Sequence, residues 1–367
     1  MNWLQRLAET YENCSDAIGK IETRKMKNKE VALTPLLPIC HTMQNAHIEI
    51  TLDEAGNFLS AKVVEKDDAP TLIPCTESSS GRTNGQCPHP LHDKLEYVAS
   101  DYSERSDGSC DYVSYKKQLS EWIQSAEDYT ALKAVFDYLE KGTLIKDCAA
   151  SKVLFLDDTN KLLNKWVDNE AAPPIFKLLP GGLDGKGKQK PWQANAFIRF
   201  SVEAKNSLGS SLQHDPVLWK LWSDYYATKE TINGLCLITG GSSTLALQHP
   251  SKIRNAGDKA KLISANDGSG FTYRGKFENP NEACSVSFEI TQKAHSALRW
   301  LIARQGRRFG DLNIVTWATM GDMPPDPIKS SFELFISPSD ISDEDETEAE
   351  MADKASKKKQ KNQKLLL

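Results

Sequence analysis

The alternation of extended and helical patterns limits the fold of this chain more than any other feature of its sequence. Apolar residues recur at helical spacing in residues 2–18, 112–140, 219–226 and 292–305. Short apolar runs typical of strands begin at Val153, Phe197, Leu235, Ser285 and Asn313. Because strand and helix patterns alternate along the chain, the sequence predicts an α+β or mixed α/β fold.

A β-hairpin is the clearest local prediction. Residues 47–64, HIEITLDEAGNFLSAKVV, alternate apolar and polar positions on both sides of a turn sequence that runs from Asp53 to Asn57. A period of two on either side of a turn is the pattern of paired antiparallel strands. Residues 76–90, TESSSGRTNGQCPHP, are too rich in Ser, Gly and Pro for regular structure and predict a long polar loop.

These patterns divide the chain into three regions. We expect an N-terminal α/β region over residues 1–110, with the hairpin and the polar loop. A mixed helical and α/β body should occupy residues 111–337. Residues 338–367 contain eight acidic residues between Asp340 and Asp353 and then six lysines between Lys354 and Lys364, which predicts a disordered tail.

Composition favours a soluble, cytoplasmic globular protein. Hydrophobic residues make up 39% of the 367 residues and charged residues 26%, both ordinary for such a protein. No apolar run approaches the ~18 residues that a membrane span requires. The eight cysteines are scattered without a C-x-x-C pair, which favours reduced thiols.

Basic residues gather locally although the formal net charge is -5. Residues 249–277 hold four lysines and two arginines among turn-forming residues. Such a segment predicts contacts with nucleic-acid phosphates, with Tyr273 available for base stacking. The candidate phosphate ligands are Lys252, Arg254, Asn255, Lys259, Lys261, Arg274 and Lys276.

A second basic set lies in the helix predicted over residues 292–305. Thr291 to Gly310 contains no acidic residue. On an ideal helix Lys293, Arg304 and Arg307 share one side with Trp300. This side predicts a weaker phosphate-binding face, and a solvated helix face is the alternative.

The polar loop is a candidate for reading DNA bases. Its short donors and acceptors on a glycine-containing backbone can enter a minor groove. We single out Ser79, Arg82, Thr83 and Asn84. From composition alone, an ordinary surface loop is the favoured alternative.

Signals for catalysis or metal binding are incomplete. Gly270–Lys276 approaches a P-loop, but Phe277 stands where magnesium needs a hydroxyl and Pro280 follows. Cys87, His89 and His92 could ligate zinc, but no second ligand pair is visible. We therefore expect no enzyme activity, no cofactor and no metal.

Four collinear segments resemble the large subunit of the type I-C CRISPR surveillance complex, Cascade. They are ESSSGRTNGQCPHPLHDKLEYV, FIRFSVE, HPSKIRNAGDKAKLISANDGSGFTYRGKF and TQKAHSALRWLIARQG. The resemblance extends from the N-terminus to about Trp317. Members of that family usually continue into a C-terminal helical bundle, whereas this chain becomes acidic and then lysine-rich. Two explanations of this difference remain open: the bundle is lost, or the chain is truncated.

The resemblance implies a non-catalytic subunit that inspects duplex DNA for the protospacer-adjacent motif and helps to open the strands. It also implies contacts with the 5′ handle of the guide RNA, with other Cascade subunits and with the helicase–nuclease. Guide pairing reads the rest of the target. Two alternatives remain: an interaction scaffold that does not touch target DNA, and a nucleotide-dependent enzyme.

Overall fold

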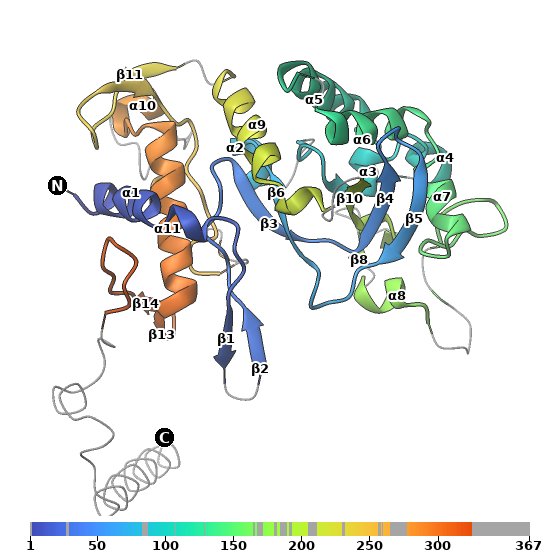
Figure 1. Cartoon of the computed structure of the whole chain (residues 1–367), viewed down its shortest axis with the longest axis horizontal. Coiled ribbons are helices and arrows are strands. Elements are labelled where there is room, and N and C mark those ends of the chain that lie inside the picture. The colour runs from blue at the N-terminus through green and yellow to red at the C-terminus, as the bar shows by residue number, and fades with distance from the viewer. Residues whose placement is uncertain are drawn as a thin grey trace, which may run out of the picture.

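The computed structural model describes residues 2–26, 29–82, 87–106, 108–127, 129–163, 166, 172–179, 182–183, 189–190, 193–204, 211–229, 232–255, 258, 260–264 and 277–324. Two regions lie next to each other (Figure 1). One contains a four-stranded sheet with helices packed on it, and the other contains two long helices that cross. The mixed α+β fold is confirmed.

The four-stranded sheet is built around the predicted hairpin. Strands β4 (Ile48–Asp53) and β5 (Phe58–Val63) pair antiparallel, as predicted. The Asp53 carboxylate accepts hydrogen bonds from the backbone N–H groups of Ala55 and Asn57 and closes the turn. Gly56 has φ +70°, and a Cβ there would lie 2.6 Å from the carbonyl oxygen of Ala134. The turn therefore requires glycine for its backbone angle and for helix packing.

The sheet has the order β5-β4-β10-β7. Strand β10 (Phe197–Glu203) runs parallel to β4, and β7 (Asp93–Lys94) pairs antiparallel with β10. The sheet thus joins strands from both sides of residue 110, and the division of the chain at that residue remains a prediction.

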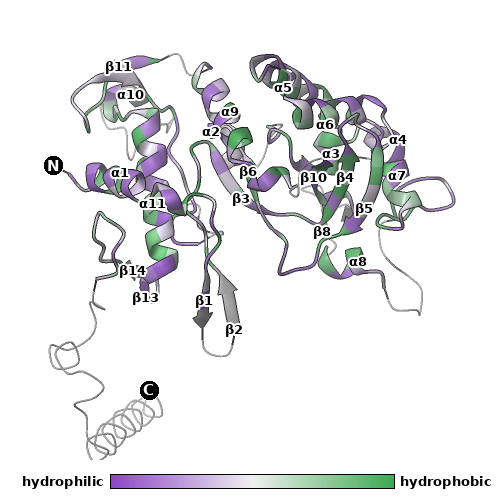
Figure 2. Ribbon diagram, viewed as in Figure 1, coloured by the Kyte–Doolittle hydropathy of each residue, from purple (hydrophilic) through white to green (hydrophobic). Residues whose placement is uncertain are grey.

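Helices cover this sheet and form the main hydrophobic core. The helical pattern of residues 112–140 is confirmed as α5 (Tyr112–Ser125) and α6 (Thr130–Glu140). Trp122 of α5 packs edge-on against Trp222 of α9 (Pro216–Ala227) at 4.9 Å between ring centroids. Hydrophobic residues concentrate on the strands and on the helix sides that face them (Figure 2).

Helix α11 (Phe288–Gln305) crosses helix α1 (Trp3–Asn13) and forms a second core with it. Leu7 of α1 and Ala297 of α11 are fully buried there, together with the largely buried Trp300. Helix α1 ends at Asn13, before the predicted Ile18, and a single 3₁₀ turn, η1 (Ser15–Ala17), follows.

Several predicted strands are wrong or shorter than expected. Residues 288–290 belong to α11, because Phe288, Thr291 and His295 are buried at helical spacing. The run from Val153 makes only one bridge, between Leu156 and Leu162. Strand β11 ends at Leu235. Short apolar runs fit a buried loop or helix as well as a strand, so periodicity alone could not separate them.

The other elements are short. The strand pairs are β1 (Thr23–Met26) with β2 (Lys29–Ala32), β3 (His41–Asn45) with β6 (Pro70–Pro74), β8 (Gly182–Leu183) with β9 (Gln189–Lys190), β11 (Asn233–Leu235) with β12 (Ser242–Thr244), and β13 (Arg307–Phe309) with β14 (Leu312–Ile314). The helices are α2 (Glu77–Ser80), α3 (Leu95–Val98), α4 (Tyr102–Arg105), α7 (Leu144–Ala150), α8 (Pro174–Leu178) and α10 (Pro280–Ala283), with 3₁₀ turns η2 (Gln193–Asn195) and η3 (Leu212–His214). No helix in the described ranges has the length and hydrophobicity needed to cross a bilayer.

A buried ion pair joins the two parallel strands and gives a test of the sheet. Arg199 of β10 donates to Glu49 of β4 from Nε at 2.6 Å and from Nη2 at 2.6 Å. We expect Glu49→Ala to lower the free energy of unfolding by about 3–5 kcal/mol, because it leaves the buried guanidinium without a counter-charge. Urea unfolding measures this. Glu9→Ala, which breaks the exposed pair with Arg6, should cost less than about 1 kcal/mol. Equal losses in the two variants would contradict the prediction.

Candidate nucleic-acid interface

The segment after β6 begins as a capped helical turn, not as the irregular loop expected from its composition. The Thr76 hydroxyl accepts from the backbone N of Ser79 at 3.0 Å, and the Ser79 hydroxyl accepts from the backbone N of Thr76 at 2.9 Å. This capping box satisfies two donors at the start of α2. Serine and threonine favour helix caps as well as loops, so their abundance did not distinguish the two.

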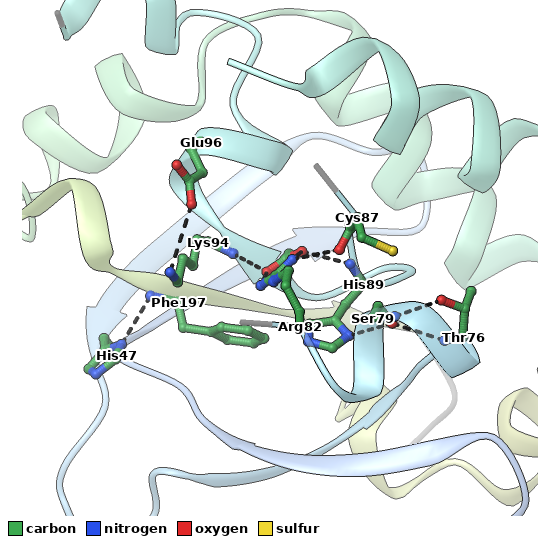
Figure 3. Close-up of polar contacts among 10 residues, drawn as sticks. His47, Thr76, Ser79, Arg82, Cys87, His89, Lys94, Glu96 and Phe197 are labelled. Atoms are coloured by element: carbon green, nitrogen blue, oxygen red, sulfur yellow. Dashed lines mark hydrogen bonds and ion pairs between the residues drawn. The ribbon is translucent and has the colours of Figure 1, made fainter. Parts of the chain in front are cut away.

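Ser79 faces the interior. Its side chain is 1% exposed, and its hydroxyl lies 2.9 Å from Nδ1 of His89 (Figure 3). Burial lowers the pKa of His89 to about 4, so the imidazole is neutral at pH 7. The expectation that Ser79 is an accessible loop donor is therefore wrong. Through its hydrogen bond with His89, Ser79 connects the start of the polar segment 76–90 to its end.

Arg82 is held in place by a buried carboxylate. Its Nη1 and Nη2 donate to the two oxygens of Asp93, each at 2.7 Å. Nη1 also donates to the carbonyl oxygen of Cys87 at 2.9 Å, and the guanidinium lies 4.5 Å from the ring centre of Tyr97. A guanidinium with these partners is not available to read bases. Arg82 instead links the carbonyl group of Cys87 to the carboxylate of Asp93.

Asp93 connects this arrangement to the central sheet. It is fully buried at the start of β7, opposite Ile198 of β10. Besides the arginine fork, its carboxylate accepts from the backbone N of His89 at 2.7 Å and of Lys94 at 2.8 Å. Four donors around one buried carboxylate make this a well-satisfied network.

The network brackets a four-residue segment. Residues 83–86 separate Arg82 from Cys87, and these two residues are joined by the hydrogen bond described above. Thr83 and Asn84 lie outside the described residues, so their proposed role in reading DNA remains a prediction.

The basic segment 249–277 is described only in part. Lys259, Arg274 and Lys276 lie outside the described residues, as does Tyr273. Arg254 is exposed, but Nε and Nη2 donate to the two oxygens of Asp258 at 2.8 and 3.1 Å. Asn255 is exposed, whereas Lys252 and Lys261 are half-buried. The segment therefore does not present all its cations to solvent.

The predicted basic face of α11 is wrong as a surface. Trp300 is buried at 3% exposure, and Arg307 lies beyond the helix in β13. Lys293 pairs with Glu12 of α1 and with Glu289 of its own helix. Arg304 donates to the carbonyl oxygen of Gly321 at 2.9 Å and stacks on Trp300 at 4.9 Å. The acid-free run did not reveal these carboxylates, because Glu12 comes from α1 and Glu289 lies two positions before the run begins.

Sequence reasoning missed Arg299. It lies on a different side of the helix from Lys293 and Arg304, and it donates to the carbonyl oxygen of Ser251. Burial lowers the pKa of Arg299 to about 10. The signal available in the sequence was its place in the acid-free run, but its neighbour Lys252 is 47 positions away and only folding brings the two together.

A pair of buried histidines joins the start of the basic segment to α11, with 6.3 Å between the ring centroids of His249 and His295. Nδ1 of His295 is 2.7 Å from the carbonyl oxygen of Thr291, and because a carbonyl can only accept, this nitrogen carries the proton. The Thr291 hydroxyl is 2.8 Å from Nδ1 of His249. Burial lowers the pKa of His249 to about 4 and of His295 to about 3. Both rings are therefore neutral at pH 7.

Comparison with known protein families identifies the chain. The family described as CRISPR-associated protein (Cas_Csd1) matches residues 7–366. The chain belongs to the Csd1 family. Csd1 proteins are large subunits of type I-C Cascade, so the resemblance seen in the four sequence segments is confirmed, and the match extends past Trp317. No curated protein sequence matches this chain.

The Csd1 chain shows no metal centre within its described residues. His89 and His92, predicted as possible zinc ligands, use Nδ1 within the fold: His89 bonds Ser79, and His92 accepts from the backbone N of Phe200 at 3.2 Å. The P-loop-like segment Gly270–Lys276 lies outside the described residues.

The buried histidines predict a loss of stability in mild acid. The unfolded chain binds protons as the pH falls below about 6.5, whereas folded His249 and His295 bind them only near pH 4 and 3. Stability is therefore full above pH 6.5 and should fall by roughly 1.4 kcal/mol per pH unit for each such histidine between pH 6.5 and 4. Urea unfolding at pH 7.5, 6 and 5 measures this. His249→Gln should make the dependence shallower, and an unchanged dependence would contradict the assignment.

Arg82 gives a second test. Arg82→Met leaves the carboxylate of Asp93 buried without a cation, and we expect the free energy of unfolding to fall by about 3–5 kcal/mol. Arg82→Lys should recover only part of this, because one ammonium cannot replace a two-pronged contact. Lys94→Met is the matched control, because its pairing with Glu96 is long, at 3.8 Å, and exposed. If Arg82→Met and Lys94→Met melt alike, Arg82 is not an anchor.

Proposed function

We propose that this Csd1 chain reads the protospacer-adjacent motif in duplex DNA through residues 83–86 and is not an enzyme. Membership of the Csd1 family gives it the place of a Cascade large subunit in CRISPR defence. As a Cascade large subunit in the cytoplasm, the chain would also help to separate the DNA strands, contact the 5′ handle of the guide RNA and recruit the helicase–nuclease. Recognition of the rest of the target would belong to guide pairing.

The observation that carries the proposal is the anchored base of the polar segment. Arg82 and Cys87 flank residues 83–86 and are joined by a hydrogen bond, and Asp93 ties Arg82 to the central sheet. Base reading needs polar side chains held in a fixed orientation. Thr83 and Asn84 have such side chains, and the buried network holds Arg82 and Cys87, the residues on either side of 83–86. Ser79 and Arg82 then act as positioning residues and not as reading residues.

Phosphate contacts would complete the interface. Phosphate contacts fix the position of a protein on a duplex, while base contacts provide specificity. Within the predicted set, Lys252 lies near the network, since its charge acts on His89, whereas the charge of Lys261 acts on His249. Lys259, Arg274 and Lys276 keep their proposed role. Arg254 and Lys293 are already paired with carboxylates, which weakens the case for them.

A second candidate function has its own support. The hairpin β13–β14 exposes Phe309, Leu312 and Ile314, and Met320 and Met323 nearby are also exposed. In this register Phe309 and Leu312 are directly paired, so they lie on one face of the hairpin. An exposed apolar patch of this kind is typical of a protein contact. It favours an interaction scaffold within the ribonucleoprotein, which is compatible with motif reading elsewhere on the chain.

Asn84 gives the decisive test of motif reading. In assembled Cascade, we expect Asn84→Ala to reduce discrimination between duplexes with and without the motif by about tenfold or more, because one base contact contributes roughly 1–3 kcal/mol of discrimination. Affinity for duplexes without the motif should stay unchanged. Equilibrium binding to both duplexes at fixed salt measures the ratio.

Asn13→Ala is the matched control, because this exposed amide on α1 bonds the carbonyl oxygen of Thr319, far along the chain from the polar segment. It should keep full discrimination. If Asn84→Ala and Thr83→Val both keep it as well, residues 83–86 do not read the motif. The assembly is then crosslinked to labelled duplex. If no DNA is crosslinked to this chain, the scaffold function is supported.

A further inference from the structure

We propose that Lys252 and Arg299 form a binding site for one phosphodiester group of a nucleic-acid backbone. The inference deepens the proposed function and rests on it. The two cations line a small cavity of about 90 Å³ between the segment after β2, strand β3, the 252–255 turn and helix α11. Polar side chains of Thr34, Thr42 and Asn255 line the same cavity, as does Arg254, whose charge is paired with Asp258.

Arg299 lines this cavity and has one donor without a hydrogen-bond partner among the described residues. It donates to the carbonyl oxygen of Ser251, but its Nε is buried and has no hydrogen-bond partner among the described residues. A buried, unpaired guanidinium donor costs free energy. Burial is also the main reason why the pKa of Arg299 falls to about 10. These costs are removed if an anion binds there.

Lys252, which lines the same cavity as Arg299, has an uncommon backbone conformation. Its φ of +60° lies in the left-handed region, where a residue with a Cβ is uncommon. The turn is held by a hydrogen bond from the backbone N of Lys252 to the carbonyl oxygen of Asp258 at 2.8 Å. Residues held in such angles concentrate at functional sites.

The two cations have no counter-charge in the described part of the chain. Burial lowers the pKa of Lys252, and the positive charge of Arg299 lowers it further. Apart from the thiol of Cys75, no acidic group of the described residues acts on either cation. Arg254 and Lys293, by contrast, each have a carboxylate. Like charges brought together in a partly buried site favour binding of an anion between them.

The chemistry of the pair suits a phosphodiester. The planar guanidinium offers directed donors to two phosphate oxygens, and an ammonium adds a mobile point charge. The site also has the right neighbours, because the charge of Lys252 acts on His89, at the base of the segment 83–86. A phosphate held there would fix the register of the strand whose bases that segment reads.

The test uses assembled Cascade and duplexes in which one phosphate at a time is replaced by an uncharged methylphosphonate. With the unchanged chain, neutralising one phosphate near the motif should weaken binding about tenfold. In Arg299→Met, and in Lys252→Met, the same replacement should have no further effect, because the contact is already lost. The slope of log K against log salt should also fall by about 0.9, the value for one phosphate contact.

Lys220→Met is the matched control, since this exposed lysine on α9 pairs with Asp224. It should retain the sensitivity to the neutral phosphate. Arg299→Lys should retain the salt slope while binding more weakly. Thermal melting of each variant excludes unfolding as the cause, and Lys252→Met serves if Arg299→Met does not fold.

The same scan along the guide RNA handle decides the source of the phosphodiester. If the variants are insensitive to a neutral phosphate in the duplex that weakens the unchanged chain, the site binds target DNA. If they are insensitive to one in the RNA handle, the site binds the guide. If every neutral phosphate, in DNA and in RNA, weakens the variants as much as the unchanged chain, the proposal is wrong. Motif discrimination is read from the same duplexes, so a failure of motif reading is seen separately from a failure of this site.

Discussion

The buried carboxylate of Asp93 is the group on which the candidate interface depends. It binds the guanidinium of Arg82 with both oxygens and also accepts two backbone hydrogen bonds, so all its charge is compensated inside the fold. Since Asp93 belongs to the central sheet, this contact ties Arg82 and, through it, Cys87 to the sheet. A charge that would be costly alone becomes an anchor once it is paired and fully hydrogen-bonded.

The basic residues of the chain also fall into two groups, according to whether a carboxylate pairs with them. Lys293 and Arg254 each have a carboxylate partner, and their charges stabilise contacts between elements. Lys252 and Arg299 lie close together without such a partner among the described residues. The paired cations hold the fold together. The cations without a carboxylate partner can instead bind an anion. The count of lysines and arginines in a segment cannot make this distinction.

The fold was predictable where local patterns were long or closed by a turn. The hairpin around Gly56 and helices α5 and α6 follow from periodicity, because the residues that pack together are neighbours in sequence. The run at Ser285 was misread because six apolar and polar residues fit a strand as well as the first turn of α11. In the site, the polar segment was found, but the roles of Ser79 and Arg82 were not, since their partners His89 and Asp93 are ten and eleven positions away.

The sequence by itself determined the family, the mixed α+β character and the segments in which polar and basic side chains concentrate, because these are properties of neighbouring residues and of collinear motifs. Tertiary structure alone decided which of those side chains are anchors and which are still without a partner. The energy of a charge depends on its burial and on the nearest opposite charge, and both are set by residues that folding brings from distant parts of the chain. Arg82 and Arg299 are alike as letters in the sequence, yet one is neutralised by Asp93 and the other lies beside Lys252.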